Sequence, residues 1–335
     1  MKIARYQETI QRYQARCNLC PHNCVIADGK TGRCHVRENA EGDIYLKTYG
    51  IVSSMGFDPI EKKPLYHFYP GKYIFSIGSY GCNLKCRFCQ NWEISQSVPD
   101  HYAKMKKFRP EDLVSMAAER RDNIGIAFTY NEPAVWFEFM MDIAGIAKSR
   151  GMKTVMVTNG FINPEPLDEL LEVIDAFNVD LKAFTEEFYR SQTLSLLEPV
   201  KNALRQIKTR GKHLEITNLV IPGLNDQMKD FTEMIRWISG NLGNDTILHL
   251  SRYFPNYKLT QPATSADDLK RLFEVAKSKL KYVYLGNLAG NSGQNTECPS
   301  CNSLLISRSR HDSVLTGLQK NGTCKNCGAL IYGQF

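Results

Sequence analysis

The sequence contains no long uninterrupted apolar segment, no low-complexity tract and no internal repeat. No stretch has the length of apolar residues that spans a bilayer, and residues 1–16 are polar and charged, unlike a signal peptide. We therefore expect a cytoplasmic globular protein without a membrane partner. The net charge of +7, from 42 basic and 35 acidic residues, is a mild excess that leaves nucleic acid open as a partner.

The cysteines lack the even number that a closed disulfide framework needs, and thiols stay reduced in the cytosol. All eleven fall into three compact groups: Cys17, Cys20, Cys24 and Cys34; Cys82, Cys86 and Cys89; Cys298, Cys301, Cys324 and Cys327. The middle group has no fourth thiolate. Three cysteines around a four-iron cluster leave one iron open to a ligand that is not protein. Because an open coordination position separates catalytic from structural metal sites, the middle group is the candidate reactive centre.

Short β-branched runs alternate with helical patterns from about Lys72 to Asn287. Two helical stripes have apolar spacing near 3.6; one of them follows a capping box at Ser265 and Asp268, and a further helix begins at Pro110. Such repeated units predict parallel strands with right-handed crossovers, and about six of them suit a barrel, complete or partial, with its site at the carboxyl ends of the strands. A doubly wound open sheet stays open from the pattern alone. The expected strands are Tyr73–Gly78, Ile124–Tyr130, Thr154–Thr158, Asn178–Leu181, Leu214–Ile221, Ile247–Tyr253 and Tyr282–Leu285.

Two small modules flank the expected barrel at residues 72–290. Residues 1–71 carry the first cysteine group and an extended segment, and residues 291–335 carry the third group. Neither module is large enough for an independent core, so we expect each to depend on a bound metal for order.

The middle cysteines stand in the loop Gly81–Trp92, directly after the first expected barrel strand. Their Cys-x3-Cys-x2-Cys spacing, with Phe88 before the last cysteine, resembles the radical S-adenosylmethionine (SAM) superfamily. The resemblance implies that Cys82, Cys86 and Cys89 hold a catalytic [4Fe–4S] cluster whose open iron binds SAM. The alternatives from the residues alone are a zinc knuckle without its fourth ligand, or three incidental thiols.

Further motifs extend this resemblance over most of the chain and indicate a branch of the superfamily. Together with both terminal cysteine modules they are similar to the AmmeMemoRadiSam-system radical SAM enzymes, which are close to the pyruvate formate-lyase activating enzymes. This resemblance implies a partial (β/α)6 TIM-like barrel. The motifs lie at residues 58–68, 90–92, 130–133, 158–161, 180–182, 221–226 and 251–255.

The resemblance also assigns cofactor-binding roles. Glu132 matches the acidic residue of a Gly-Gly-Glu motif that holds the SAM amino group, although Tyr130 and Asn131 replace its glycines. The alternative role of Glu132 is to stabilise a helix N-terminus. Asp180 and Lys182 match an Asp-x-Lys motif, with Lys182 pairing with the SAM carboxylate and Asp180 with ribose, a cation or substrate. Their alternative is an ordinary salt bridge on one strand.

Five further residues complete the expected cofactor site. Thr158 and Asn159 end the third strand, Phe88 lies in the cysteine loop, and Arg252 near the end of the sixth strand is placed to meet the SAM carboxylate or an anionic substrate. Asn131 belongs to the same set. His249 is expected to be satisfied packing. Val157 occupies the place of an aspartate that binds a monovalent cation in pyruvate formate-lyase activators, which argues against that cation site.

The terminal cysteine groups each have four thiolates and thus a closed ligand set. The third group has two Cys-x2-Cys knuckles 22 residues apart, the pattern of a zinc ribbon, which rubredoxin-like iron also fits. The first group, Cys-x2-Cys-x3-Cys-x9-Cys, fits either structural zinc or an auxiliary iron–sulfur cluster; we favour zinc at this stage.

The predicted function is therefore that of a radical SAM enzyme that cleaves SAM to a 5′-deoxyadenosyl radical, which abstracts hydrogen from a substrate. The resemblance implies a reductant such as flavodoxin or ferredoxin, and a protein substrate activated by formation of a glycyl radical. Two alternatives remain: radical-based modification of RNA, and a metal-stabilised scaffold that binds RNA or protein.

Overall fold

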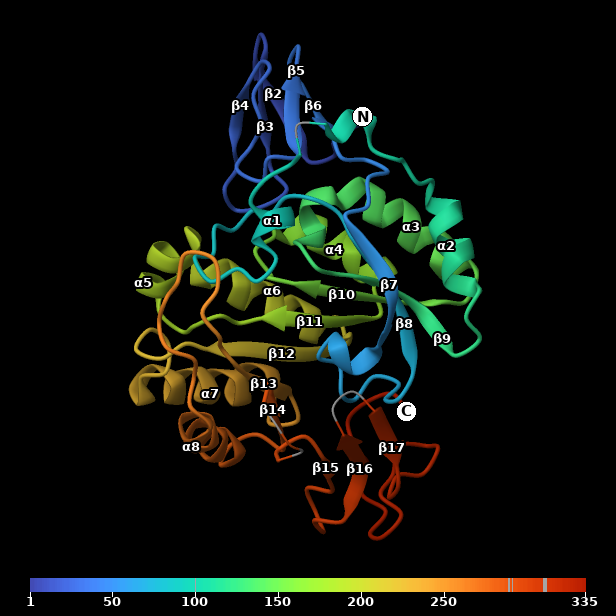
Figure 1. Ribbon diagram of the computed structural model, residues 1–335, viewed down its shortest axis with the longest axis vertical. Helices are drawn as coiled ribbons and strands as arrows, with labels where there is room; N and C mark the ends of the chain where they lie inside the picture. The colour runs from blue at the N-terminus through green and yellow to red at the C-terminus, as the bar shows by residue number, and fades with distance from the viewer. Residues whose placement is uncertain (100, 289, 291, 310–311) are drawn as a thin grey trace.

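The computed structural model describes residues 1–99, 101–288, 290, 292–309 and 312–335. Three parts follow one another along the long axis of the molecule: small N-terminal sheets, a curved central sheet with its helices, and a C-terminal sheet (Figure 1). In the described residues no helix is both long and apolar enough to cross a membrane.

The central sheet has eight strands in the order β14-β13-β12-β11-β10-β9-β8-β7. Neighbours from β8 to β14 pair in parallel, while β7 pairs antiparallel with β8. The strand order follows the chain without reversal, which excludes the doubly wound sheet. It confirms a partial barrel of six strand–helix units that are followed by a seventh parallel strand. The bounds are β7 (Ser54–Pro59), β8 (Tyr73–Gly78), β9 (Asn123–Phe128), β10 (Lys153–Thr158), β11 (Ala176–Asp180), β12 (His213–Val220), β13 (Ile247–Arg252) and β14 (Tyr282–Gly286).

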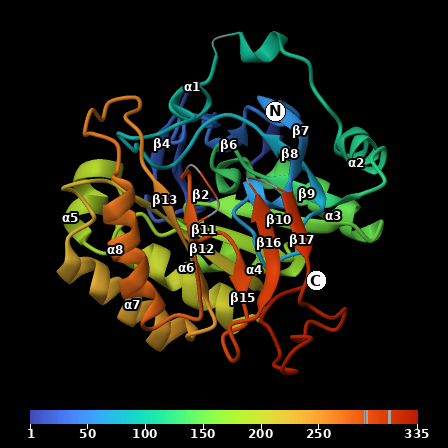
Figure 2. The same cartoon turned by 60° about the horizontal axis from the view of Figure 1, so that its bottom comes forward.

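The helices lie along the outer side of this sheet (Figures 1 and 2). The stripe Phe231, Met234, Ile235, Ile238 and Leu242 is buried as its spacing predicted, Pro110 begins its helix, and the Ser265 hydroxyl accepts a hydrogen bond from Asp268 N at 3.0 Å. The α-helices are α1 (Trp92–Ser95), α2 (Pro110–Ala118), α3 (Phe137–Ser149), α4 (Pro164–Val173), α5 (Glu186–Phe188), α6 (Leu197–Thr209), α7 (Met228–Leu242) and α8 (Ala266–Lys277). Short turns are η1 (Ile60–Lys62), η2 (Tyr102–Lys104), η3 (Pro133–Trp136) and the π-helical η4 (Tyr189–Thr193).

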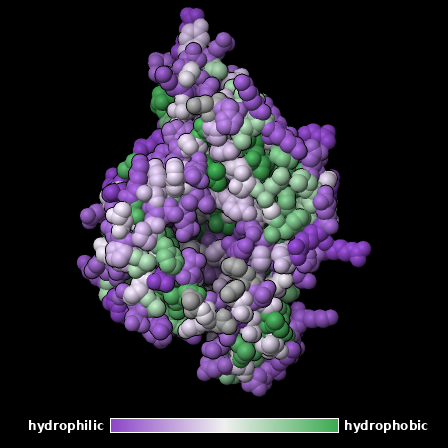
Figure 3. Space-filling model, in the orientation of Figure 1, coloured by the Kyte–Doolittle hydropathy of each residue, from purple (hydrophilic) through white to green (hydrophobic). Residues whose placement is uncertain are grey.

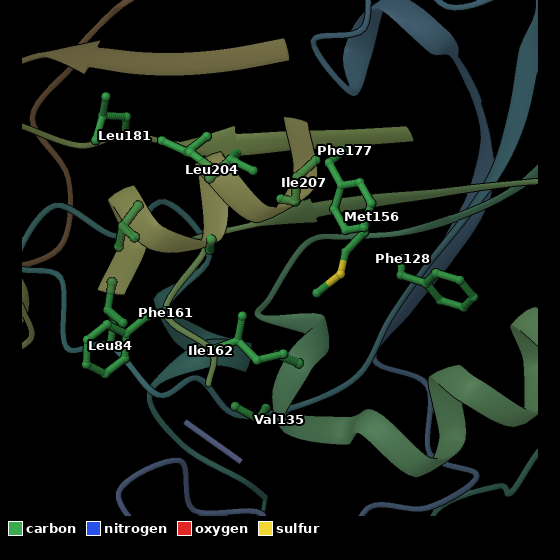
Figure 4. Close-up of a cluster of buried hydrophobic side chains, with 14 of the residues drawn as sticks. Leu84, Phe128, Val135, Met156, Phe161, Ile162, Phe177, Leu181, Leu204 and Ile207 are labelled. Carbon is green, nitrogen blue, oxygen red and sulfur yellow. The ribbon is translucent and has the colours of Figure 1, made fainter. Parts of the chain in front are cut away.

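The main core lies between the sheet and these helices. Figure 4 shows Phe128, Met156 and Phe177 of three successive strands beside Leu204 and Ile207 of α6, in a cluster that also contains Leu84 of the cysteine loop. Because side chains alternate along a strand, the residues between these apolar ones point to the other face. On β11 to β13 that inner face carries Asn178, Asp180, Glu215, Thr217 and His249, so the barrel interior is polar there.

The interior is closed at the amino ends of the strands. Ile60, Leu65 and Phe68 form a buried cluster there with Ala127, Val155 and Ala176. Above them the buried Glu215 carboxylate accepts hydrogen bonds from Tyr66 N (2.9 Å) and His67 N (2.8 Å), and it pairs with His213 (2.9 Å) and His249 (2.6 Å). His249 is thus fully used in packing and pairing, as the sequence analysis expected.

The C-terminal sheet packs against the same closed end. Its strands are β15 (Thr296–Glu297), β16 (Leu304–Ser309) and β17 (Asp312–Leu315), in that order. Arg308 donates a hydrogen bond to Tyr66 O at 2.6 Å. Gln334 O accepts a hydrogen bond from Tyr69 N (2.7 Å), and Gln334 N donates one to His67 O (2.8 Å). The third cysteine group therefore lies at the end of the barrel opposite to the carboxyl ends of the strands.

The N-terminal strands form two small antiparallel sheets, β1-β6-β5 and β2-β3-β4. They are β1 (Lys2–Ile3), β2 (Gln7–Gln11), β3 (Gln14–Cys17), β4 (Val25–Ala27), β5 (Arg37–Ala40) and β6 (Asp43–Leu46). These sheets dock on α3 and on the loop after β10: Arg37 forms a buried ion pair with Glu138, and Asn163 donates to Leu19 O (3.1 Å) and Asn18 O (2.7 Å). This places the first cysteine group near the carboxyl ends of the strands.

Candidate active site

The cysteine loop leaves the end of β8 through Gly81, whose φ of +85° favours glycine. A Cβ at Gly81 would also lie 2.5 Å from Cys34 O, so the loop packs directly against the N-terminal module. Lys85 N and Arg87 N donate to Thr193 O (2.8 Å) and Gln192 O (3.0 Å), which fixes the loop on the η4 turn.

The three loop cysteines are largely shielded from solvent. Burial raises the pKa of the Cys86 thiol to about 12 and also raises the pKa values of Cys82 and Cys89. These thiols are therefore poor free nucleophiles and ionise only together with a bound cation. Among the described residues, their sulfurs do not form a set lying within 4.8 Å of one another, which is too open for a single tetrahedral ion.

Glu132 lies at the end of β9 and is 3% exposed. Its Oε1 accepts hydrogen bonds from Thr158 Oγ1 (2.7 Å) and Ala134 N (3.1 Å), and its Oε2 accepts one from Asn159 N (2.8 Å). Burial raises the pKa of this carboxyl to about 7, although the hydrogen bonds lower it. The site thus holds an acid whose charge depends on what binds beside it. Its contact with Ala134 N also caps η3, the alternative role considered from the sequence.

Asparagines connect this strand end to the cysteine loop. Asn131 accepts from Ser79 N (3.0 Å) and donates to Gly81 O (2.8 Å). Asn159 Nδ2 donates to Asn83 Oδ1 at 2.9 Å and lies 3.7 Å from Cys82 Sγ. Asn131 therefore positions the loop, and Asn159 reaches the first loop sulfur itself.

Asp180 and Lys182 meet on the other side of the loop. Lys182 Nζ lies 2.8 Å from Asp180 Oδ2 and 5.9 Å from the Phe88 ring centroid. Burial alone would lower the pKa of Lys182, but the charges of Asp180 and Cys86 raise it, so the ammonium stays protonated. The ordinary salt bridge that the sequence left as the alternative for this pair does form. The electrostatic interaction of Lys182 with Cys86 also places the pair at the cysteine loop.

Arg252 lies apart from this group. Its Nε donates to Thr264 O at 2.6 Å, and its guanidinium packs 4.7 Å from the Phe254 ring centroid. Among the described residues it forms no hydrogen bond or ion pair with the other predicted cofactor-binding residues. Figure 3 shows that one face of the molecule is hollowed near its middle, with largely hydrophilic residues around the hollow.

Three residues that position this site were not predicted from the sequence. Asn83 Oδ1 accepts a hydrogen bond from Asn159 Nδ2, and Asn83 Nδ2 donates one to Phe161 O at 2.7 Å. Asn225 Nδ2 donates to Lys182 O at 2.6 Å, and the Tyr189 hydroxyl accepts from Lys182 N at 3.1 Å. Asn83 and Asn225 stand inside motifs noted in the sequence, but the contacts that they make are long-range and are not readable there.

The C-terminal cysteines form a compact group. All four sulfurs lie within 4.8 Å of one another, with Cys298–Cys327 at 3.6 Å and Cys301–Cys324 at 3.7 Å. Tetrahedral zinc with Zn–S bonds of about 2.3 Å requires sulfurs about 3.8 Å apart, so this group can hold one metal ion. The N-terminal cysteines line one cavity together with Arg37 and Asn83.

The residues of the loop site fit the cofactors that the predicted family uses. The donor set comprises three thiols with separated sulfurs, a buried carboxylate at Glu132 and an ammonium at Lys182. An iron–sulfur cluster takes thiolate ligands, while a carboxylate and an ammonium complement the amino and carboxylate groups of an amino acid.

Comparisons with known proteins agree with this geometry. A model of the Radical SAM superfamily matches residues 76–238. An uncharacterized protein of Methanocaldococcus jannaschii is 42% identical over 334 residues, 99% of each chain. Pyruvate formate-lyase 1-activating enzyme of Escherichia coli is 25% identical over 183 residues, 52% of this chain and 71% of that enzyme. A radical SAM methyltransferase from Sphaerobacter thermophilus shares the fold, with a TM-score of 0.51, 16% identity and 71% of each chain covered.

Proposed function

Because this chain belongs to the radical SAM superfamily, we propose that it activates a partner protein by removing a hydrogen atom from it. As a radical SAM enzyme, it uses a [4Fe–4S] cluster to cleave SAM reductively, and the 5′-deoxyadenosyl radical abstracts the hydrogen. The similarity to activating enzymes supports a protein as the substrate and a reductant as a partner. We propose a donor of the flavodoxin or ferredoxin class.

The observation that carries the enzymatic part of the proposal is the pair of charged groups on either side of the cysteine loop. Glu132 is held in place by three hydrogen bonds and presents a buried carboxylate for the SAM amino group. Lys182 keeps its proton beside Asp180 and presents a cation for the SAM carboxylate. Because both side chains are ordered by their neighbours, little conformational entropy is lost when SAM binds.

The remaining residues orient these groups. Cys82, Cys86 and Cys89 would ligate the cluster, and Thr158 and Asn159 hold the Glu132 carboxylate. Phe88 covers the loop next to Lys182, and Asn131 fixes the loop to the strand end. Arg252 remains a candidate for an anionic substrate group. At the far end of the barrel, the C-terminal cysteine group would hold zinc in a structural role.

Product analysis tests the enzymatic part of the proposal. Anaerobically reconstituted protein with reductant and SAM is expected to yield 5′-deoxyadenosine and methionine. Cys86→Ala should abolish both products, whereas the matched Cys327→Ala, at the opposite end of the barrel, should retain them. Product formation by Cys86→Ala at the wild-type rate would refute the assignment of the loop.

Isotope transfer tests the substrate class. The source cells are grown on glycine that is deuterated at its α-carbon. Their protein fraction is then incubated with the enzyme, reductant and SAM. Deuterium in 5′-deoxyadenosine supports a protein substrate. Deuterium transferred only from the RNA fraction of deuterated cells would refute it in favour of RNA modification.

A further inference from the structure

The two terminal cysteine groups have the same number of sulfurs but different geometry. The C-terminal group has all four sulfurs within 4.8 Å of one another. Among the described residues, no three of the N-terminal sulfurs (Cys17, Cys20, Cys24 and Cys34) meet that condition, and in this respect they resemble the three loop cysteines. One tetrahedral ion holds its thiolates about 3.8 Å apart, whereas a four-iron cluster places irons and sulfides between them. The wider spacing therefore disfavours zinc.

The N-terminal sulfurs nevertheless converge. They line one cavity, to which Asn83 of the cysteine loop also contributes. Cys17 and Cys34 are buried, and Cys20 and Cys24 are half-buried. Enclosing four thiols around a shared space is stable when they ligate a cation, because each thiolate then has a partner.

Cations surround this cavity. Arg37 is 1% exposed and interacts electrostatically with Cys17 and Cys34 while it pairs with Glu138. Lys85 lies between the two cysteine groups, where it interacts electrostatically with Cys34 on one side and with Cys82 and Cys86 on the other. Its Nζ is buried and has no hydrogen-bond partner among the described residues. A buried ammonium needs a compensating negative charge, and a thiolate-ligated cluster on each side would supply it.

We propose that Cys17, Cys20, Cys24 and Cys34 hold a second [4Fe–4S] cluster, fully ligated by cysteine, which exchanges single electrons with the centre at Cys82. This replaces the zinc that the sequence favoured at this site. The cluster assignment does not depend on the proposed function, whereas the electron exchange rests on it.

The contacts between the two sites support electron exchange. His22, between Cys20 and Cys24, lies 2.9 Å from Asn83 O, and Asn83 follows Cys82 in the chain. On the other side, Cys24 is flanked by exposed Asn23 and Val25. One electron would leave a low-potential donor of the flavodoxin or ferredoxin class at this outer side, enter the second cluster, and pass on to the centre at Cys82. The donor is oxidised by one electron and no proton or bond changes.

Metal analysis of the full chain tests the cluster assignment. Anaerobically reconstituted wild type should contain about eight irons, about eight sulfides and one zinc per chain, since each cluster contributes four irons. The triple variant Cys82→Ala/Cys86→Ala/Cys89→Ala should retain about four irons, and so should the matched Cys17→Ala/Cys20→Ala/Cys24→Ala. Two zincs per wild-type chain with about four irons would overturn the proposal, and this count does not require the loop variant to fold.

Electron paramagnetic resonance tests full cysteine ligation. The reduced cluster in the Cys82/Cys86/Cys89 variant should give a spectrum that SAM leaves unchanged, because no iron is open to it. A shift on addition of SAM would contradict the assignment. Failure of the proposed function would give a different result: reconstituted wild type would contain about eight irons but would produce no 5′-deoxyadenosine.

Lys85 provides a test of electrostatic contact between the two clusters. Lys85→Met removes a cation near both, so both midpoint potentials should become more negative. Arg87→Met removes an exposed cation from the same loop and should shift them less. A shift of only one potential, or of neither, would overturn the placement of Lys85 between two clusters.

The rate of reduction tests the relay. With flavodoxin as donor, reduction of the remaining cluster should be at least tenfold slower in the Cys17/Cys20/Cys24 variant than in wild type. Equal rates would overturn the relay, while the iron count would still decide the cluster.

Discussion

The ion pair between Arg37 and Glu138 fastens the N-terminal module to the barrel, and its removal should open that junction. Both side chains are 1% exposed, and Arg37 Nη2 lies 2.8 Å and 2.9 Å from the two carboxylate oxygens. The same carboxylate accepts from Arg5 N at 2.8 Å. Arg37→Met would leave a buried carboxylate with one donor, and breaking a buried pair on one side costs about 3–5 kcal/mol.

Amide hydrogen exchange measures this cost locally and does not require two-state unfolding. In Arg37→Met, exchange of the Arg5 amide should accelerate by about a hundredfold to a few thousandfold, the equivalent of about 3–5 kcal/mol at about 1.4 kcal/mol per tenfold. The double variant Arg37→Met/Glu138→Gln removes both charges but keeps a side-chain oxygen to accept from Arg5 N, and it should recover most of the protection, because no unpaired charge remains.

A surface pair supplies the control. Arg109 and Asp112 are 76% and 44% exposed, and such pairs contribute less than about 1 kcal/mol. Arg109→Met should therefore leave exchange of the Arg5 amide unchanged and accelerate exchange in α2 less than tenfold. Acceleration below tenfold in Arg37→Met, or equal acceleration in the double variant, would refute the reasoning.

Further predictions concern the carboxylates of Glu132, Asp58 and Glu215. Glu132→Gln should weaken SAM binding about tenfold to a hundredfold in anaerobic calorimetry, because a charged hydrogen bond contributes about 1.5–3 kcal/mol. In wild type SAM affinity should rise from pH 6 to pH 8, since the carboxyl, with a pKa of about 7, must lose its proton to accept an ammonium; a flat profile would contradict this. Burial alone would raise the pKa of Asp58, but the hydrogen bond from Lys63 and the charge of Lys63 lower it to about 2. The stability that the Asp58 carboxylate contributes should therefore be complete above about pH 4 and be lost as the pH falls toward 2. In acid-unfolding curves this loss should be smaller for Asp58→Asn than for wild type. Glu215→Gln should lower stability by about 3–5 kcal/mol in urea unfolding, because the amide cannot accept from all four partners; a loss below about 1 kcal/mol would contradict the network.

The sequence predicted the barrel because its elements are locally encoded. Each of the seven expected strands lies within two residues of an observed strand at both ends, since β-branched runs between helical stripes leave few alternatives. The roles of the cysteine loop, Glu132 and the Asp180–Lys182 pair came instead from the resemblance to a known family. The fold brings these residues together because parallel strands have their carboxyl ends at one edge.

The strand at Ser54–Pro59 was not predicted. It pairs antiparallel with β8 at the edge of the barrel, and neither its length nor its composition distinguishes it from the extended segment around it. The polar residues that position the loop were missed for a related reason: Asn83 and Asn225 contact residues far away in the chain, and a single sequence does not record which distant groups become neighbours.

The sequence by itself determined how many thiolates each metal site has, because the ligands of each group are close together in the chain. Only the tertiary structure decided how far apart the sulfurs lie, and this separation is the observation behind the proposed second cluster. The spacing Cys-x2-Cys-x3-Cys-x9-Cys allows either a single ion or a cluster, since loop residues between ligands adjust to both. Sulfur separation, the burial of Lys85 between the two groups and the contact of Arg252 with Thr264 all depend on packing between segments distant in sequence.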